Sequence, residues 1–287
     1  MNETYTPEKA PAPGNSGVSG DSFEYCAEQV RLYDSDRYFS SLFAPPGQRK
    51  ALIALYAFNL EIAKTRETVS EPMLGHIRLQ WWRDALDGIY RGTPRQHTVV
   101  LALGEVLKDG HVPRCLLDEM IDGRERDLED EPMASLEQLA AYCAATSGAL
   151  TCAALAVAGS GEGLLTAGRE AGTAYAMTGL IRAAPYLASA GRSVLPGIPA
   201  AEVVPGSQPV RDAIRDMAGH VEDSLVKLGS GLDGLSREER PAVLPFATCR
   251  ADVASAGKAG FDPFAFRERP RITRHARMMW ALMTGKF

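Results

Sequence analysis

Hydrophobic residues recur at three- and four-residue spacings along most of the chain, and this periodicity constrains the fold more than any other feature. Residues 48–69 contain no Pro or Gly, and Leu52, Leu55, Phe58 and Ile62 follow the spacing of a long, mostly buried helix. Further helices are expected at 22–32, 74–90, 98–108, 114–129, 135–155, 164–188, 210–228 and 237–256, and after Pro270. No alternating apolar–polar stretch exceeds four or five residues, so an all-α fold is predicted.

The chain length suits one large hydrophobic core. With 287 residues, 45% of them hydrophobic and 23% charged, the sequence lies near the upper end for a single domain. Residues 1–20 are polar and rich in Pro, Gly and Ser, a composition that buries too little apolar surface to become ordered. We therefore expect a disordered N-terminal tail over residues 1–20 and one helical domain over residues 21–287.

Charge, cysteine usage and hydropathy exclude several classes of protein. The formal net charge of −5 argues against a nucleic-acid partner, because phosphate binding needs a basic face. Residues 1–20 lack the apolar core of a signal peptide, and no run approaches 18 uninterrupted apolar residues. The five cysteines form no Cys-x-x-Cys pair, which predicts reduced, buried thiols: Cys26, Cys115, Cys143, Cys152 and Cys249. We expect a cytoplasmic protein, with peripheral membrane contact left open.

No single segment spells out a complete catalytic or metal-binding site. The five histidines are scattered, without a His-x-x-x-His pair, and no glycine-rich phosphate loop follows a strand. The run of mixed charge at residues 124–131 is typical of a solvated helix face. Three acidic pairs have helical spacing: Glu67 with Glu71, Asp84 with Asp87, and Asp118 with Asp122. Two such faces can hold Mg²⁺ ions that bridge a diphosphate, although acidic pairs also occur on ordinary exposed helices.

Several segments, taken in order, resemble the squalene/phytoene synthase family of head-to-head prenyl-diphosphate synthases. Residues 45–67 have the family's proline, arginine and Ala-x-x-Ala-Leu-Tyr-Ala-Phe pattern, which leads into its first aspartate-rich motif. Residues 121–128 resemble its Gly-Met-x-x-Asp-Leu segment, residues 142–148 its Tyr-Cys helix, and residues 179–196 the frame of its second motif. The resemblance covers roughly residues 25–280. It implies an isoprenoid (terpenoid) synthase fold, a single helical domain around a central cavity.

The family's two aspartate clusters face each other and bind Mg²⁺, which draws the diphosphate off a prenyl chain. In this chain the first cluster, normally Asp-Asp-x-x-Asp, is Ala-Lys-Thr-Arg-Glu, and the second is Ala-Ala-Pro-Tyr-Leu. Five residues occupy vestigial positions of the two clusters, and one of them is a lysine: Ala63, Lys64, Glu67, Ala183 and Leu187. One remaining carboxylate holds Mg²⁺ only weakly, and the ion supplies several kcal/mol of transition-state stabilisation. The resemblance therefore implies that prenyl transfer is crippled.

Three arginines, Arg49, Arg182 and Arg192, fall where the family has arginines. The resemblance implies a ligand-binding site in which they hold a diphosphate-like anion. Salt bridges to retained acids such as Asp127 are the equally weighted alternative. No catalytic residue and no metal ligand is assigned.

A narrower resemblance connects the chain to one branch of the family, which includes the mitochondrial complex I assembly factor with a phytoene synthase-like domain. Residues 57–61, 69–72 and 77–84 carry it. It implies a non-catalytic protein that binds a prenyl-type lipid or a protein partner and is linked to the assembly of respiratory complex I. A location at the periphery of the inner membrane is compatible with this role. No cofactor is then expected.

Two other hypotheses stay open. The first is an active, Mg²⁺-dependent head-to-head prenyltransferase of isoprenoid biosynthesis that uses Glu67, Glu71, Asp118 and Asp122 as substitute ligands. It requires these carboxylates to converge on one cavity. The second is a purely structural interaction protein with a collapsed cavity, whereas a large apolar cavity would argue for lipid binding.

Overall fold

The computed structural model describes residues 18–69, 71–229, 231–232, 234–266 and 270–287. Over these residues the chain forms helices and connecting loops without a strand, which confirms the all-α prediction. The α-helices are α1 (Val18–Tyr33), α2 (Ser35–Ser41), α3 (Pro46–Ala63), α4 (Thr65–Thr68), α5 (Pro72–Tyr90), α6 (Thr98–Leu107), α7 (Arg114–Gly123), α8 (Leu136–Cys143), α9 (Ala149–Val157), α10 (Glu162–Ser189), α11 (Gln208–Lys227), α12 (Arg240–Val243), α13 (Cys249–Lys258) and α14 (Arg271–Thr284). Short 3₁₀ or π turns join several of them: η1 (Arg124–Leu128), η2 (Ala144–Gly148), η3 (Ala200–Glu202), η4 (Leu244–Thr248) and η5 (Pro263–Ala265).

Most predicted helices are present, but several are interrupted. The helix expected over 48–69 ends at Ala63, and the separate turn α4 follows Lys64. The helix expected over 237–256 is broken into α12, η4 and α13. Pro245 explains that break, because proline lacks an amide hydrogen and clashes with the preceding turn of a helix. Helix α1 begins at Val18, inside the expected tail; residues 1–17 lie outside the described residues, so the tail stays a prediction there.

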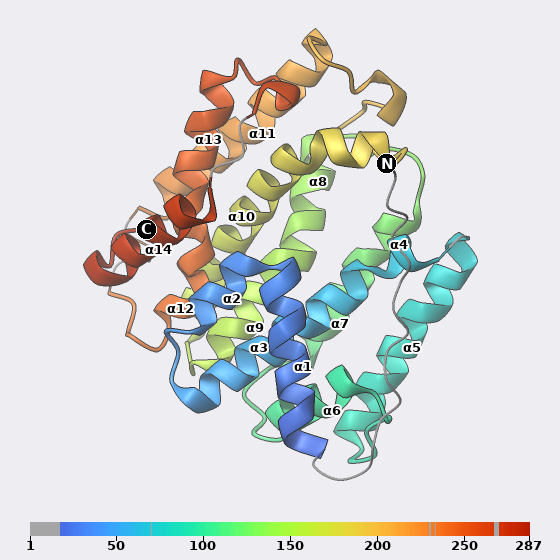
Figure 1. Ribbon diagram of the computed structural model, residues 1–287, viewed down its shortest axis with the longest axis vertical. Coiled ribbons are helices and arrows are strands. Elements are labelled where there is room, and N and C mark those ends of the chain that lie inside the picture. The colour runs from blue at the N-terminus through green and yellow to red at the C-terminus, as the bar shows by residue number, and fades with distance from the viewer. Residues whose placement is uncertain (1–17, 70, 230, 233, 267–269) are drawn as a thin grey trace, which may run out of the picture.

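Helix α3 is largely buried, and it lies behind α1 in Figure 1. It packs against α1, α6 and α9, while α10 packs against α9 and α11 on the other side of the bundle. Leu52, Leu55, Tyr56 and Phe58 of α3 are almost completely buried. One continuous apolar core extends from α1 to α13, and a smaller cluster lies beneath α14.

Helices α9 and α10 approach each other very closely, because glycines face the contact. A Cβ atom added at Gly172 would lie 2.4 Å from the backbone oxygen of Ser147, and one at Gly168 would lie 2.2 Å from Leu155. The hollow beside this contact, next to Arg37 and Tyr175, has a volume of only about 10 Å³. A space of that size holds at most one water molecule. This part of the bundle is packed solid and leaves no room for a lipid chain.

One helical run, residues 136–157, is long and apolar enough by itself to cross a membrane. Two thirds of its most apolar window, 67%, is buried among the other helices. This burial is typical of the core helix of a folded domain. Ser135 begins the run as predicted, since its hydroxyl accepts a hydrogen bond from the Gln138 amide at 3.3 Å.

The cysteines differ in exposure, which corrects the expectation that all are buried. Cys115 is exposed, while the other four are buried and free. Burial raises the pKa of the Cys26, Cys143 and Cys249 thiols to about 12. At neutral pH, therefore, only a very small fraction of each thiol is ionised to the reactive thiolate.

We predict that iodoacetamide at pH 8 adds a single group to the native protein, at Cys115, and five after denaturation. Mass spectrometry of the intact protein and of its peptides counts and places the adducts. A Cys115→Ser variant should acquire none in the native state. Rapid labelling of a second cysteine in the native protein would contradict the burial described.

Candidate functional site

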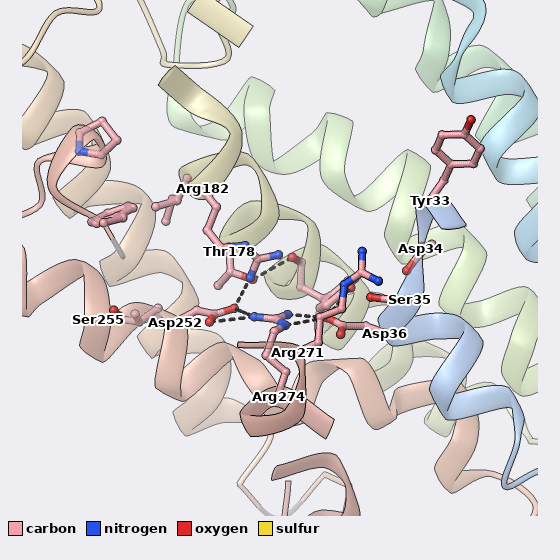
Figure 2. A pocket seen from close by; sticks show the side chains of 15 residues that line it. Tyr33, Asp34, Ser35, Asp36, Thr178, Arg182, Asp252, Ser255, Arg271 and Arg274 are labelled. Carbon is pink, nitrogen blue, oxygen red and sulfur yellow. Dashed lines mark hydrogen bonds and ion pairs between the residues drawn. The ribbon is translucent and has the colours of Figure 1, made fainter. Parts of the chain in front are cut away.

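A polar pocket of about 420 Å³ lies between the junction of α1 and α2, helices α10, α13 and α14, and the turn η5. Figure 2 shows that its charged side chains come from segments far apart in the sequence and point toward one another. Its charges are balanced between three aspartates and three arginines: Asp34, Asp36, Asp252, Arg182, Arg271 and Arg274. Because positive and negative charges alternate, the pocket is not a strongly cationic cradle.

Arg274 of α14 lies at the centre of this arrangement. Its guanidinium donates two hydrogen bonds to Asp252, at 2.9 and 2.7 Å, and two to Asp36, at 3.0 and 2.5 Å. A further bond of 3.1 Å goes to the Thr248 hydroxyl. The planar guanidinium thus bridges two carboxylates from opposite walls, a geometry that suits arginine better than lysine.

The surroundings keep this arginine charged. Burial disfavours the guanidinium cation, but the bonds and charges of Asp36 and Asp252 outweigh burial, so the pKa of Arg274 is raised above its ordinary value. Burial, followed by the charges of Asp34 and Asp36, raises the pKa of the Tyr175 phenol well above its ordinary value. Tyr175 therefore stays neutral and donates to Asp36 at 3.2 Å.

Local sequence explains how α2 presents its aspartates. Asp34 precedes α2, and its side chain accepts a hydrogen bond from the Arg37 amide at 3.2 Å, as an N-cap residue does. Asp36 then falls in the first turn, where a carboxylate is favoured by the helix dipole. Pro270 precedes α14 and Arg274 lies in its first turn, on the side that faces the pocket.

Arg37 carries a second buried charge just below the pocket. It forms a salt bridge with Asp34 at 2.8 Å and donates to the Ser147 hydroxyl at 2.7 Å. Its guanidinium also lies 5.0 Å from the centre of the Tyr175 ring. Burial disfavours its charge, yet Asp34 and the two neighbouring tyrosines raise its pKa. The space beside the contact of α9 and α10 is thus filled by the charged side chain of Arg37, which its partners hold in place.

A third network surrounds Asp127, within the run of mixed charge. Arg124 pairs with Asp127 at 3.3 Å, and the Tyr142 hydroxyl donates to Asp127 at 2.9 Å. Both charged side chains are mostly buried, so the prediction of a solvated helix face is wrong for Arg124 and Asp127. The turn η1 points these two residues inward, whereas Glu129 in the same run remains exposed.

The three arginines predicted to hold an anion do not share one site. Arg49 donates to the backbone oxygens of Leu42 and Ala44, at 2.8 and 3.2 Å, beside a different groove. Arg182 lines the polar pocket and pairs with Asp252. Arg192 pairs with Asp127 at 3.4 Å. Two of the three thus have the acidic partners foreseen as the alternative, and anion binding by them stays a prediction.

The vestigial positions lie at the ends of α3 and α10. Ala63 is the last residue of α3, and the Lys64 ammonium lies 3.7 Å from the centre of the Tyr33 ring, which lines the polar pocket. Glu67 in α4 is exposed. Ala183 and Leu187 are half-buried in α10, one and five residues after Arg182. The first former cluster thus adjoins the polar pocket through Tyr33, and the second adjoins it through Arg182. The basic groups at these two borders are those of Lys64 and Arg182.

The substitute carboxylates do not converge on that pocket. Asp118 pairs with Arg114 at 3.1 Å and Asp122 with Arg83 at 2.5 Å, both on the outside of α7. Glu67 and Glu71 are exposed, and neither is among the residues that line the pocket. The convergence required by the hypothesis of substitute ligands is therefore absent.

The pocket carboxylates also do not fit the Mg²⁺ ions that the resemblance implies. Mg²⁺ needs near-octahedral oxygen ligands at about 2.0–2.1 Å. Asp36 and Asp252 instead have the Arg274 guanidinium between them. Over the described ranges, no group of three His, Cys, Asp or Glu side chains is placed to hold a metal ion. The Arg274 guanidinium thus occupies the space between the Asp36 and Asp252 carboxylates.

Comparisons with known proteins identify the family of this chain. The model of the squalene/phytoene synthase family matches residues 30–276. The chain belongs to this family. Among its relatives, complex I assembly factor 6 of Mus musculus is 29% identical, over 88% of this chain and 79% of that protein.

Solved structures of family members share the fold. A dehydrosqualene synthase aligns with a TM-score of 0.78 at 15% identity, over 92% of this chain and 96% of that one. Squalene synthase HpnC from Alicyclobacillus acidocaldarius aligns with a TM-score of 0.74 at 17% identity, over 85% of this chain and 96% of that one. These likenesses confirm the isoprenoid synthase fold of a squalene/phytoene synthase family member.

Sequence reasoning missed the residues that dominate the pocket: Asp36, Asp252 and Arg274. One signal was available, because residues 271–287 contain arginines but no Asp or Glu. A buried arginine without an acid in its own helix must find a partner elsewhere. The partner Asp36 lies 238 residues away in the chain, which no local pattern identifies.

Proposed function

We propose that this family member does not transfer prenyl groups and acts through a protein partner in the assembly of respiratory complex I. The observation that carries the proposal is the bridge from Arg274 to Asp36 and Asp252, with Arg182 beside it. These contacts use the carboxylates of the pocket that would otherwise be available to a metal ion. The name of the relatives, complex I assembly factor 6, supports the assembly role.

Pocket chemistry favours a protein partner over a prenyl lipid. A prenyl chain needs a long apolar cavity, and the hollow where α10 meets Arg37 is only about 10 Å³. The polar pocket of about 420 Å³ is lined mainly by charged and hydroxyl side chains, with Ile181, Val253, Pro263 and Phe266 as its apolar members, and its charges are already balanced. A diphosphate would have to displace Asp252 from Arg182 and Arg274 before it could bind there.

Deletion of the gene in the source organism tests the assembly role. We expect membranes of the deletion strain to lose NADH oxidation coupled to quinone, while succinate oxidation and the output of squalene or phytoene stay unchanged. Expression of the intact chain should restore NADH oxidation. Unchanged NADH oxidation, or a loss of isoprenoid product, would refute the proposal.

A complemented strain refines this test. The Arg182→Gln variant removes the positive charge just before the second cluster and leaves the Arg274 bridge in place. If the pocket only stabilises the fold, a variant that accumulates to the normal level should restore NADH oxidation fully. If the pocket binds a ligand needed for assembly, the variant should accumulate normally and yet fail to restore it.

A further inference from the structure

Helix α14 has apolar side chains on the side that faces solvent. Ile272, Trp280 and Met283 are exposed, and Met283 retains 78% of its surface. Residues 272 and 283 are eleven positions apart, about three turns, so they share one face, and Trp280 borders it. Met278 and Ala281 are fully buried on the opposite side. Figure 1 shows α14 at the outer edge of the molecule.

The apolar face continues into a groove of about 650 Å³ at the C-terminal end of α14. Met283 and Leu282 form one wall, and Leu42 and Phe43 after α2 form another. Leu42 is itself exposed, so apolar surface from two distant segments is contiguous here. Isolated exposed apolar residues are ordinary, whereas a contiguous patch marks an interaction surface.

Positive charges surround this patch. Residues 271–287 carry three arginines and one lysine without a single Asp or Glu, in a chain whose net charge is −5. Arg274 is used in the polar pocket, and Arg277 donates to the Ala247 oxygen at 2.9 Å. Arg271, which also borders the polar pocket, and Lys286 are exposed at the two ends of the segment 271–287. The groove adds Arg49, Arg237 and Arg240, against one acid, Glu238.

We propose that the outer face of α14, together with Leu42, docks on the surface of an anionic phospholipid bilayer. An apolar helix face that carries an aromatic residue and is flanked by cations has the chemistry of an interfacial helix. Trp280 suits the headgroup level, where its ring is partly apolar and its N–H finds water. The exposed arginines and lysine meet the negative surface potential of the lipid. This inference goes beyond the assembly role and does not depend on it.

Charge argues against a second copy of the chain as the occupant. In a two-fold contact between antiparallel α14 helices, Arg271 of one copy would face Lys286 of the other. Residues 271–287 offer no acid to compensate, so such a contact would bring like charges together. An anionic surface satisfies the same cations without that repulsion.

Co-sedimentation of the full chain with lipid vesicles tests the proposal. We expect at least tenfold tighter binding to phosphatidylcholine vesicles that contain phosphatidylglycerol than to phosphatidylcholine alone. Salt at about 1 M, where the Debye length is about 3 Å, should release most of the protein. The fluorescence of Trp280 should shift to shorter wavelength on binding, and this shift should be missing in Trp280→Phe.

A matched pair of variants tests the surface itself. Met283→Glu should weaken binding to the anionic vesicles at least tenfold. Val226→Glu changes an equally exposed residue, 80% accessible, on α11, and should bind as the wild type does. Thermal melts confirm that both variants fold.

Several results would overturn the proposal: absence of vesicle binding, equal binding to neutral and anionic vesicles, or equal behaviour of the two variants. Sedimentation showing a dimer that Met283→Glu dissociates would assign the face to a second copy and would likewise overturn it. None of these results bears on NADH oxidation in the deletion strain, so this inference and the assembly role fail independently.

Discussion

Replacement of Arg274 by methionine is expected to lower the free energy of unfolding by about 3–5 kcal/mol. The side chains of Arg274, Asp36 and Asp252 are 10%, 8% and 7% exposed, so solvent screens their charges little. Methionine keeps much of the side-chain volume but leaves Asp36 and Asp252 facing each other without their shared cation. Breaking a buried ion pair from one side is costly because the remaining charge stays buried. Urea unfolding followed by circular dichroism measures the loss.

Arg277→Met provides the matched control on the same helix. The Arg277 guanidinium donates to one backbone oxygen, that of Ala247, and its loss should cost about 0.5–1.5 kcal/mol. A double variant, Arg274→Met with Asp36→Asn, should recover part of the loss because it removes the carboxylate that has lost its arginine, whereas Asp252 keeps its pair with Arg182. If Arg274→Met were no more destabilising than Arg277→Met, the bridge would not be the stabilising centre described here.

Gly172→Ala is the second change with a large expected effect. The added methyl group would lie 2.4 Å from the Ser147 oxygen, 2.5 Å from the Thr151 hydroxyl oxygen and 2.9 Å from the Gly148 Cα. Two of these atoms belong to the backbone of the neighbouring helical run, which cannot rotate away as a side chain can. Overpacking of this kind costs about 1–3 kcal/mol, and we expect the upper part of that range.

Gly179→Ala in the same helix should have the opposite sign. A Cβ atom at Gly179 meets no atom within 4 Å. Replacing a helical glycine with alanine then stabilises by about 0.5–1 kcal/mol, since it reduces the entropy of the unfolded chain. Thermal unfolding of the two variants under identical conditions should therefore give Tm shifts in opposite directions. A destabilisation of equal size at both positions would mean that the close approach of α9 and α10 is not present.

The fold could be predicted largely from sequence because it rests on local periodicity. The apolar spacing of Leu52, Leu55 and Phe58 identifies α3 without knowledge of its neighbours. The break at Lys64 was missed because lysine is a good helix former and no proline or glycine marks the end of α3. Tertiary contacts decide that boundary, where the Lys64 ammonium lies over Tyr33.

The polar pocket could be predicted only in part. The resemblance identified Arg182 and the missing aspartates, since those positions lie within recognisable motifs. Asp36, Asp252 and Arg274 lie outside the motifs and meet only through folding, because the contact of Arg274 with Asp36 spans 238 residues. The same limit explains why Asp118 and Asp122 seemed candidate ligands, since spacing along a helix does not reveal which face points inward.

The proposed loss of prenyl transfer rests on two features. The metal-binding aspartates are missing from both cluster positions, and the Arg274 guanidinium lies between two carboxylates of the pocket. The most direct measurement is pyrophosphate release from farnesyl or geranylgeranyl diphosphate by the purified chain with Mg²⁺, together with extraction of any C30 or C40 hydrocarbon. We predict release no greater than that of a heat-killed sample. Pyrophosphate release accompanied by a head-to-head hydrocarbon product would show that the chain is an active prenyltransferase.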